Sequence, residues 1–509
     1  MSATIGLQAL RRNTAGVDVS GALNLVGTLI KYLSAAFLFP TVLALGYGEP
    51  AWPYVASGMI VLAFGLVLER VTSRGGVIRA QEGFLVVSVV WALAAWAVAL
   101  PYLFAEPQLR NPIDAYFEAM SGITTTGATT LIDIAALDQS MAMWRQFSQW
   151  IGGMGIVVLA LAILPRLRVG GSRQLVESEM PGPEYEPLKT TIRDTARRLW
   201  LVYVGLSALM TLILCILGWT GIDDLMTEYQ AAAHMFAAMP TGGFSPQPRS
   251  LEPFAPASQW VIGVFMLLAG ANFALHYRAV VRRASPFRDE EFRLYLAFIF
   301  VATAGIFLEL LRADIFAAGE GALRNAFVNV VSIMTTTGFA TSDFALWTGA
   351  TSFIFVVLML IGGCAGSTAG AIKVVRVSLL AKALHREVDQ TIHREAVVPL
   401  SVNGRIVDER TVRAVLGFLL FYLLLFLGGA FVLAIEEARA GLEAAPFVHV
   451  ATSATMLGNV GPSLGFAGPM GSMDPYSPFS KSVMILLMWA GRLEIIPVAV
   501  LLTRRYWRA

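Results

Sequence analysis

The chain has 509 residues, of which 56% are hydrophobic and 14% charged, and its mean hydropathy is +0.66. These values exclude a string of soluble domains and are typical of a protein that lies in a lipid bilayer. The formal net charge of +2 excludes the strongly basic surface that nucleic-acid binding needs, so membrane lipid is expected around the chain and no nucleic-acid partner.

The apolar stretches are long enough to cross a bilayer as helices, which takes about 20 residues each. A polar start with Arg11 and Arg12 precedes the first stretch, as in an uncleaved membrane anchor. Ten membrane spans are predicted, at about 23–46, 52–69, 81–105, 146–165, 195–219, 257–277, 291–311, 350–380, 411–435 and 482–503.

Basic residues determine the predicted orientation, because cytoplasmic loops retain lysine and arginine. With the N-terminus inside, 28 of these residues fall on the cytoplasmic side and 7 on the outer side. Both termini are therefore predicted to be cytoplasmic, in the cell's inner membrane. Acidic residues gather in the outer loops, where they are expected to attract cations.

Four outer connections contain an apolar stretch too short to span, followed by Thr, Ser or Asn and a glycine. They read FEAMSGITTTGATTL (117–131), HMFAAMPTGGFSP (234–246), VNVVSIMTTTGFATSDF (328–344) and VATSATMLGNVGPSLGF (450–466). Matching Gly127, Gly242, Gly338 and Gly461 gives intervals of 115, 96 and 123 residues. Each interval has room for a helix, a short helix, an extended segment and a second helix, which indicates an internal repeat.

The repeat predicts an all-α membrane protein built from four helix, pore-helix, helix units around a pseudo-fourfold pore. Non-helical backbone at membrane depth must be buried in protein or line a wet cavity, so the four segments are expected to converge on one axis. The predicted divisions are 1–78 as a helical pair outside the repeat, then 79–185, 186–286, 287–400 and 401–509 as the four units.

Glycine after threonine suits a backbone that turns successive carbonyl oxygens toward a central axis, because glycine adopts the required dihedrals at little cost. Oxygens arranged in this way replace the hydration shell of a large monovalent cation. One TTTG segment alone would equally fit an ordinary turn. Two near-identical copies and two looser ones at equivalent positions favour a selectivity filter.

The order of two spans and then four such units, with TTTG, PTGG, TTTG and NVG, resembles the Trk/Ktr/HKT superfamily of potassium transporters, most closely its TrkH branch. Further matching motifs are WIGGMGIVVLALAILP (150–165), AGANFALHYRA (269–279), GGCAGSTAGAIKVVRV (362–377) and GRLEIIPV (491–498). The resemblance implies potassium uptake, a homodimer, and a cytosolic nucleotide-binding regulatory subunit of the TrkA type that docks on the basic inner loops.

The resemblance also implies a K⁺ filter formed by the residues before and at each matched glycine. These residues are Thr125, Thr126, Gly127, Pro240, Thr241, Gly242, Thr336, Thr337, Gly338, Asn459, Val460 and Gly461. Pro240 lacks a backbone N–H, and the fourth segment has Asn459 and Val460, so the symmetry is imperfect and K⁺ over Na⁺ selectivity is expected to be weaker than in symmetric channels. Glycine at all four positions favours K⁺, since a serine there accompanies Na⁺ transport in related plant members.

A run of glycines, Gly362, Gly363, Gly366 and Gly370, interrupts the second span of the third unit and is poor in helix propensity. The resemblance implies an intramembrane loop that obstructs the pore beneath the filter. A glycine-rich helix face for close packing is the alternative. Lys373 either shares in gating or marks the cytoplasmic end of this broken span.

Arg492 lies about twelve residues, roughly 18 Å, from the inner end of the last span, too deep to snorkel to the surface. Such a charge faces the protein or the pore. The resemblance implies an electrostatic barrier in the ion path, and a buried structural pair is the alternative. Glu494 cannot meet Arg492 on one helical face, so each is expected to have another partner.

Five other side chains are interpreted as mainly structural. Cys215 and Cys364 offer neither a disulfide framework nor a CxxC pair and are interpreted as small core residues. His234 and His449 on the short helices are expected to pack or form hydrogen bonds. Glu118 is expected to do the same or to enrich cations at the outer mouth.

Two other functions compete with a potassium pore. A membrane-embedded transferase would want paired carboxylates or a histidine cluster, which the loops do not assemble. A secondary transporter coupled to H⁺ or Na⁺ typically uses helices broken at the midplane. No Rossmann fingerprint, P-loop or HExxH appears, so this chain is not expected to be an enzyme or to hold an organic cofactor, and K⁺ is its expected permeant ion.

Overall fold

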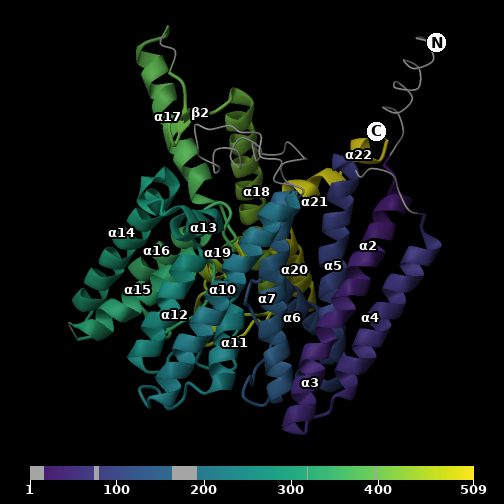
Figure 1. The fold of residues 1–509 in the computed structure, drawn as a ribbon. Helices are drawn as coiled ribbons and strands as arrows, with labels where there is room; N and C mark the ends of the chain where they lie inside the picture. Colours follow the sequence, from purple (N-terminus) through teal and green to yellow (C-terminus); the bar gives the residue numbers. More distant parts are fainter. Residues whose placement is uncertain (1–16, 74–78, 163–191, 318, 396–397, 509) are drawn as a thin grey trace, which may run out of the picture.

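The computed structural model describes residues 17–73, 79–162, 192–317, 319–395 and 398–508. Within these ranges almost all of the regular secondary structure is helical, which confirms the helical class (Figure 1). The predicted features that fall elsewhere lie outside the described residues. They are Arg11, Arg12, the end of the span at 146–165 and the divisions after 78 and 185.

The N-terminal part is a pair of packed helical stretches. The elements are α2 (Val19–Leu33), η1 (Ser34–Phe37), α3 (Leu38–Tyr47) and α4 (Trp52–Val71). A Cβ built on Gly65 would lie 2.8 Å from the carbonyl oxygen of Gly27, so α2 and α4 need glycine to approach this closely. Lys31, a charge within the first predicted span, pairs with Glu69 of α4 at 2.7 Å.

The remaining helices lie in the four predicted units, and in each unit a helix of 11 to 15 residues follows a longer first helix. The four sets are α5 (Ala80–Ala105), η2 (Pro107–Leu109), α6 (Pro112–Ile123) and α7 (Gln139–Ala162); α10 (Ile192–Trp219), α11 (Glu228–Ala238), α12 (Pro256–Ala269) and α13 (Phe273–Arg282); η3 (Pro286–Arg288), α14 (Glu290–Arg312), α15 (Glu320–Met334), η4 (Phe344–Leu346), α16 (Gly349–Leu360) and α17 (Val374–Ile392); α18 (Glu409–Ala440), α19 (Pro446–Gly458), η5 (Gly465–Ala467), α20 (Pro478–Arg492), α21 (Ile496–Leu501) and α22 (Arg504–Arg508).

Local sequence signals explain where the short helices begin. The Asn111 side chain accepts a hydrogen bond from the N–H of Ile113, and Pro112 occupies the first turn of α6, where its missing N–H costs nothing. The Thr227 side chain caps α11 in the same way. With 12, 11, 15 and 13 residues, α6, α11, α15 and α19 are all shorter than the ~20 residues that a bilayer crossing takes.

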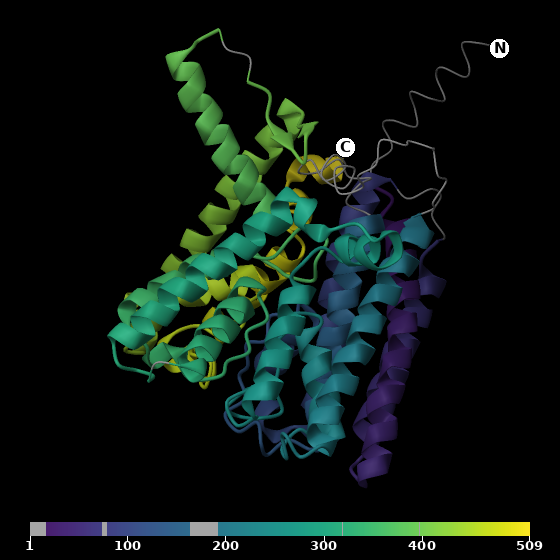
Figure 2. The same ribbon diagram turned by 60° about the vertical axis from the view of Figure 1, so that its left-hand side comes forward.

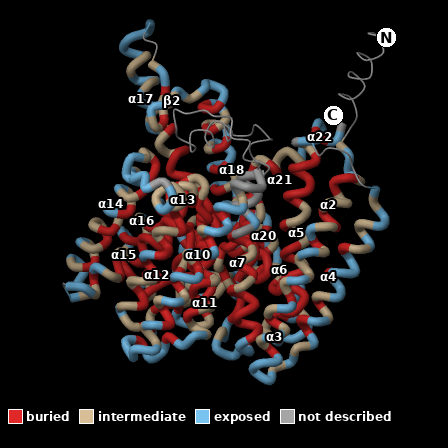
Figure 3. Tube along the Cα trace, viewed as in Figure 1, coloured by how far each residue is buried: buried red, intermediate tan, exposed pale blue. Residues whose placement is uncertain are grey.

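The helix after each short helix packs against the next short helix. Thus α7 contacts α11, α12 contacts α15, α16 contacts α19, and α20 contacts α6, which closes the series on itself. Figure 3 shows buried positions concentrated in the middle of the molecule, around α7, α19 and α20. The core therefore lies where the short helices and their followers meet.

Six helical stretches are long and apolar enough to span a membrane in the part of the chain that the structure describes. They are Val19–Tyr47, Trp52–Val71, Gln81–Ala105, Ala196–Trp219, Glu290–Arg312 and Glu409–Ala440. Pro256–Ala269 with Phe273–Val281 would be a seventh, bent by 98°. The predicted span at 350–380 is interrupted as expected, and those at 257–277 and 482–503 are also broken, so these three stretches are not continuous helices.

Among the described residues, one small sheet accompanies the helices. Strands β1 (Ser401–Val402) and β2 (Arg405–Ile406) pair antiparallel around Asn403 and Gly404, whose φ angles of 49° and 74° fit a type I′ turn. This hairpin joins α17 to α18. Figures 1 and 2 show it at the end of the molecule where α2 begins and where α22 lies.

Candidate functional site

The segments that follow the four short helices share one backbone pattern. The first members with positive φ are Thr125, Thr241, Thr336 and Asn459, at 54°, 57°, 57° and 55°. Two residues later come Gly127, Gly243, Gly338 and Gly461, at 85°, 76°, 88° and 106°. A left-handed conformation is costly for threonine. Strain of this kind, repeated at equivalent places, typically marks a functional site.

This pattern shifts the second segment by one residue from the match made on the sequence. Gly243, and not Gly242, has the positive φ of Gly127. Gly242 takes the place of Thr126, and Pro240 precedes the shared pattern. Either glycine of PTGG satisfies the motif, so the register becomes visible only in the backbone.

The amides of the four segments are held from behind by the last turns of the short helices. The N–H groups of Thr126, Gly242, Thr337 and Val460 donate to the carbonyl oxygens of Ser121, Ala237, Ser332 and Thr455, at 2.8, 2.8, 2.8 and 2.9 Å. In each case the acceptor lies five residues back. The shared bond fixes all four segments to their helices in the same way.

The glycines bring the segments into contact in cyclic order. A Cβ on each glycine would overlap a carbonyl oxygen of the next segment, namely Gly127 with Gly242, Gly243 with Thr337, Gly338 with Val460, and Gly461 with Thr126. The fourth segment thereby returns to the first. The same four glycines border one recess of about 540 Å³, open solvent included.

The second segment differs from the first and third in its side-chain support. Pairs of threonine hydroxyls lie behind the first and third segments. They are Thr124 with Thr126 and Thr335 with Thr337, each at 2.7 Å. Gln149 of α7 stands where a side chain at Gly242 would lie. Its Nε2 donates to the carbonyl oxygen of Gly242 at 2.6 Å, and its Oε1 accepts from the N–H of Phe244 at 3.1 Å.

In the fourth segment, Asn459 joins its neighbours through its side chain. The Asn459 Nδ2 donates to Thr126 Oγ1 at 3.0 Å and to the carbonyl oxygen of Met488 at 2.9 Å. The fourth segment is therefore tied both to the first segment and to α20. The four segments share a backbone conformation, but their side chains differ in chemistry.

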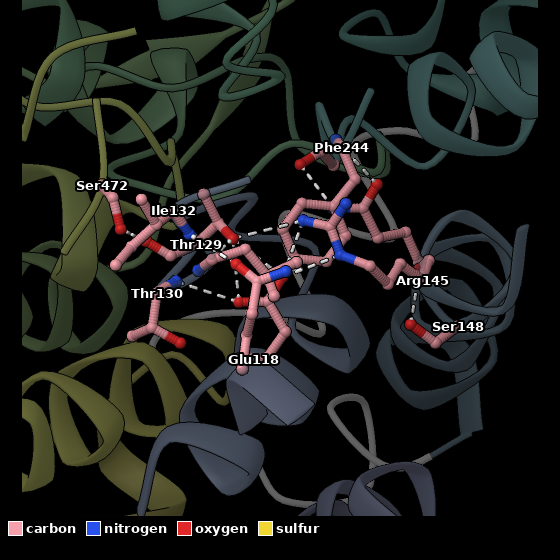
Figure 4. Close-up of polar contacts among 12 residues, drawn as sticks. Glu118, Thr129, Thr130, Ile132, Arg145, Ser148, Phe244 and Ser472 are labelled. Carbon is pink, nitrogen blue, oxygen red and sulfur yellow. Dashed lines mark hydrogen bonds and ion pairs between the residues drawn. The ribbon is translucent and has the colours of Figure 1, made fainter. Parts of the chain in front are cut away.

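Glu118 is not an exposed acid at the outer mouth. Its side chain is buried and forms an ion pair with Arg145 of α7 at 2.6 Å (Figure 4). It also accepts from the Thr129 hydroxyl at 3.0 Å and the Thr130 N–H at 3.1 Å. The Arg145 guanidinium lies 4.1 Å from the ring centre of Phe244. Of the two interpretations of Glu118, the structure supports hydrogen bonding and packing over cation enrichment, because a buried arginine compensates its charge.

The interruption of the third unit is a loop between α16 and α17. Ile361 and Ile372 form an isolated bridge, and the Gly362 N–H donates to the Ile372 carbonyl oxygen at 2.9 Å. All four predicted glycines, Gly362, Gly363, Gly366 and Gly370, lie in this non-helical stretch, and so does Lys373. They do not form a glycine-rich helix face.

This loop reaches the segments described above. The Gly370 N–H donates to the Thr336 hydroxyl oxygen at 2.7 Å. The Thr368 hydroxyl lies 3.1 Å from the carbonyl oxygen of Met239 and 3.3 Å from that of Ala269, both of the second unit. Through these two residues the loop contacts the second unit and the segment of its own, third unit.

Arg492 joins the end of α20 to the same loop. Its side chain is 2% exposed, and its Nη1 donates to the carbonyl oxygen of Thr368 at 2.9 Å. Its Nε and Nη2 have no hydrogen-bond partner within the described ranges. Lys373 donates to the Ala369 carbonyl oxygen. Glu494 pairs with Arg376 at 2.5 Å, which confirms that Arg492 and Glu494 have separate partners.

Sequence reasoning missed Glu291 of α14. The Glu291 Oε1 accepts from the N–H groups of Ala365 at 2.8 Å and Val375 at 3.0 Å, one inside the loop and one just after it. An acid in the first turn of an apolar helix is common, so its sequence position alone gave no signal. Gln149 was missed for a similar reason.

The histidines and cysteines have the structural roles expected of them. His234 contacts the Gln230 carbonyl oxygen at 2.8 Å and the Ser245 hydroxyl at 3.1 Å, and His449 contacts the Tyr476 hydroxyl at 3.3 Å. Cys215 and Cys364 are buried and form no disulfide with each other. Among the described residues, no group of three or more His, Cys, Asp or Glu is placed to hold a metal ion.

Comparison with known proteins agrees over nearly the whole chain. The family model "TrkH: Cation transport protein" matches residues 53–508. The chain is 36% identical to the Trk system potassium uptake protein TrkH of Escherichia coli K12 over 95% of this chain and 98% of the relative, and 32% identical to E. coli TrkG over 98% and 100%. The crystal structure of the potassium transporter TrkH from Vibrio parahaemolyticus matches with a TM-score of 0.85 and 32% identity, covering 96% of this chain and 100% of that one. The chain belongs to the TrkH family of cation transport proteins.

Proposed function

We propose that this protein takes up potassium ions across the cytoplasmic membrane through a filter that four segments of one chain build around a pseudo-fourfold axis. The observation that carries the proposal is the closed series of contacts from Gly127 through Gly243 and Gly338 to Gly461 and back. The names of the relatives, potassium uptake protein and potassium transporter, support the choice of ion.

The backbone supports a carbonyl-lined filter. Because the amides of the segments donate backward to the short helices, their carbonyl oxygens are left to replace water around a passing cation. The ion-binding residues are Thr125, Thr126, Gly127, Thr241, Gly242, Gly243, Thr336, Thr337, Gly338, Asn459, Val460 and Gly461, with Pro240 just ahead of the second set.

The asymmetry of the segments bears on selectivity. Gln149 withdraws part of the electron density of the Gly242 carbonyl oxygen, since that oxygen accepts its amide at 2.6 Å. Glycine at all four equivalent positions favours K⁺. Selectivity for K⁺ over Na⁺ is weaker than in a filter of four identical segments, because Gln149 partly engages one of the carbonyl oxygens.

The gate is the loop 361–373 together with Arg492. Four glycines give the loop the freedom to move, namely Gly362, Gly363, Gly366 and Gly370. Lys373 lies at the end of the loop, just before α17. Contacts of Gly370 with Thr336 and of Thr368 with Met239 place the loop against the filter segments. Arg492 holds the loop through the Thr368 carbonyl oxygen and adds a positive charge that opposes cations.

We infer the division into units, the topology and the oligomeric state from the sequence prediction alone. The units are 79–185, 186–286, 287–400 and 401–509, with 1–78 outside them, both termini in the cytoplasm and the chain paired as a homodimer. A cytosolic nucleotide-binding subunit of the TrkA type opens the gate. Family membership and the basic inner loops, with exposed residues of α17 and β2 beyond the gate loop, support such a partner.

Uptake coupled to H⁺ or Na⁺ is the second candidate. The bend of 98° between α12 and α13, and the break between α20 and α21, favour it, because coupled transporters commonly use broken helices. The two candidates differ in what drives uptake and not in the ion that passes.

Rb⁺ uptake into proteoliposomes tests both candidates. Vesicles loaded with K⁺ should accumulate external Rb⁺, and external K⁺ should compete with Rb⁺ far better than Na⁺ does. Passive permeation predicts uptake that needs no H⁺ or Na⁺ gradient, whereas coupling predicts that collapsing one gradient abolishes it. No Rb⁺ uptake under any gradient, with or without the cytosolic subunit, would contradict a potassium pathway.

A further inference from the structure

A second fourfold pattern lies on the short helices. Nine residues before the glycines Gly127, Gly243, Gly338 and Gly461 stand Glu118, His234, Asn329 and Thr452. All four side chains are buried, at 0% exposure. An acid, an imidazole, an amide and a hydroxyl therefore occupy one equivalent position in the four units. A shared residue type is absent, so motif comparison does not reveal the position.

Each of these side chains bonds to its own segment two or three residues beyond the glycine. Glu118 accepts from the Thr129 hydroxyl at 3.0 Å. The other three contacts are His234 Nε2 with Ser245 Oγ at 3.1 Å, Asn329 Nδ2 with Thr341 Oγ1 at 2.8 Å, and Thr452 Oγ1 with Ser463 Oγ at 2.8 Å. We call each such contact a strap. The hydrogen bond recurs although the chemistry of its partners does not.

The straps complete the fixation of the filter segments. Behind each segment, the amide before the glycine is tied to the last turn of the short helix. The strap ties the stretch after the glycine to the middle of the same helix. The carbonyl-bearing residues between these two anchors are therefore clamped at both ends. A binding site keeps its geometry when its supporting contacts fix it in this way.

We propose that Glu118, His234, Asn329 and Thr452 are positioning residues that hold the four segments at the width that suits K⁺, and thereby set the preference for K⁺ over Na⁺. The inference rests on the proposed function, since it names what tunes the same filter. A segment released at its outer end can move inward around a smaller ion, so loss of a strap weakens discrimination before it weakens transport.

The strap of the first unit is the strongest. It is the charged one, and Arg145 compensates Glu118 in a buried ion pair. Because the Arg145 guanidinium also lies over Phe244 of the second segment, the pair links two neighbouring segments (Figure 4). Changes at this strap should therefore affect selectivity more than changes at the three neutral straps.

Two isosteric substitutions test the first strap. Thr129→Val deletes the hydroxyl that donates to Glu118. Thr130→Val is the matched control, because the Thr130 hydroxyl has no hydrogen-bond partner among the described residues and the substitution keeps the backbone N–H. The measurement is the ratio of Rb⁺ to Na⁺ uptake by proteoliposomes that hold equal amounts of each variant. We expect Thr129→Val to lower the ratio about fivefold, the factor that one ordinary hydrogen bond is worth, and Thr130→Val to leave it unchanged.

The fourth strap supplies a rescue experiment. Thr452→Val removes the hydroxyl that meets Ser463 and Tyr476, whereas Thr452→Ser keeps it. The serine variant should restore the wild-type uptake ratio and the valine variant should not. A purely structural role would lower the thermal midpoint of both changes without altering the ratio, so thermal unfolding is measured on the same samples.

The outcomes separate the strap proposal from the proposed function. Normal Rb⁺ uptake with an unchanged Rb⁺ to Na⁺ ratio in Thr129→Val and Thr452→Val overturns the strap proposal alone. A wild-type protein that passes no Rb⁺ overturns both. An Rb⁺ to Na⁺ ratio that falls equally in Thr129→Val and Thr130→Val also overturns the strap proposal, because the effect then comes from any change to valine and not from loss of the strap.

Discussion

Glycine is required at Gly127, Gly243, Gly338 and Gly461 because the backbone of the next segment fills the space where a side chain would lie. Gly338 has a φ of 88°, and its Cβ would overlap the Val460 carbonyl oxygen. Gly338→Ala should lower Rb⁺ uptake about fivefold or more, since strain of roughly 1–3 kcal/mol falls on a site that must keep its shape. The measurement is Rb⁺ uptake by proteoliposomes.

Gly349→Ala is the control for that change. Gly349 begins α16 in the same unit, and a Cβ there would meet nothing within 4 Å. It should keep wild-type uptake. Equal loss of Rb⁺ uptake in the two alanine variants would contradict a requirement for glycine that is specific to the position of Gly338.

In the proposed gate, Arg492 both holds the loop and opposes the ion with its charge. Replacing it with alanine removes both the bond to Thr368 and the positive charge. We expect Arg492→Ala to raise Rb⁺ uptake severalfold at equal protein content. Arg492→Lys keeps the charge but cannot reproduce the geometry of the guanidinium, so it should fall in between. Unchanged uptake in Arg492→Ala would count against the barrier.

At the residue scale, the sequence was informative where a residue type has few possible roles. The TTTG segments, the glycine run and a deep arginine fall in this class, and in the structure Arg492 of α20 donates to the loop that holds the glycines. Gly243, Gln149 and Glu291 were not predicted. Gly242 and Gly243 are identical in type, and a glutamine or an acid on a helix serves many purposes, so only three-dimensional proximity distinguishes them.

Among the elements, α14 is bonded to the loop 361–373 through one carboxylate. Glu291 accepts from Ala365 within the loop and from Val375 just after it. Glu291→Ala leaves both N–H groups without this acceptor and should free the loop. We expect faster hydrogen exchange of the amides at 362–373, together with higher Rb⁺ uptake.

Glu290, next to Glu291 in the sequence, serves as the control for the contact between Glu291 and the loop. Glu290 pairs with Lys382 of α17, outside the loop, at 2.7 Å. Glu290→Ala should leave exchange at 362–373 as in the wild type. If Glu291→Ala exchanges there no faster than Glu290→Ala, the carboxylate does not hold the loop.

Element boundaries were predictable where capping residues mark them and unpredictable where tertiary contacts break a helix. Asn111 with Pro112 begins α6 by an ordinary cap. The break after α20, in contrast, gives Glu494 and Ile495 positive φ angles of 57° and 63°. A β-branched residue rarely adopts that conformation, so apolar composition at 482–503 predicted a continuous helix.

On the scale of the whole molecule, the orientation in the membrane remains a prediction from the charge distribution. Two exposed isoleucines allow a matched test, Ile132 in the outer loop at 76% exposure and Ile406 of β2 at 73%. In intact cells, a membrane-impermeant thiol reagent should label Ile132→Cys, and it should label Ile406→Cys only after the cells are opened. Cys215 and Cys364 are buried, so background labelling should be low. The reverse pattern would invert the topology.

The whole account depends on four segments of one chain surrounding a single ion. The most direct measurement is the anomalous scattering of Rb⁺ in crystals of the protein grown with Rb⁺ in place of K⁺. The account predicts density between the segments of Gly127, Gly243, Gly338 and Gly461, with carbonyl oxygens of all four units around it. Density that touches only one unit, or none between the four segments while Rb⁺ is transported, would contradict it.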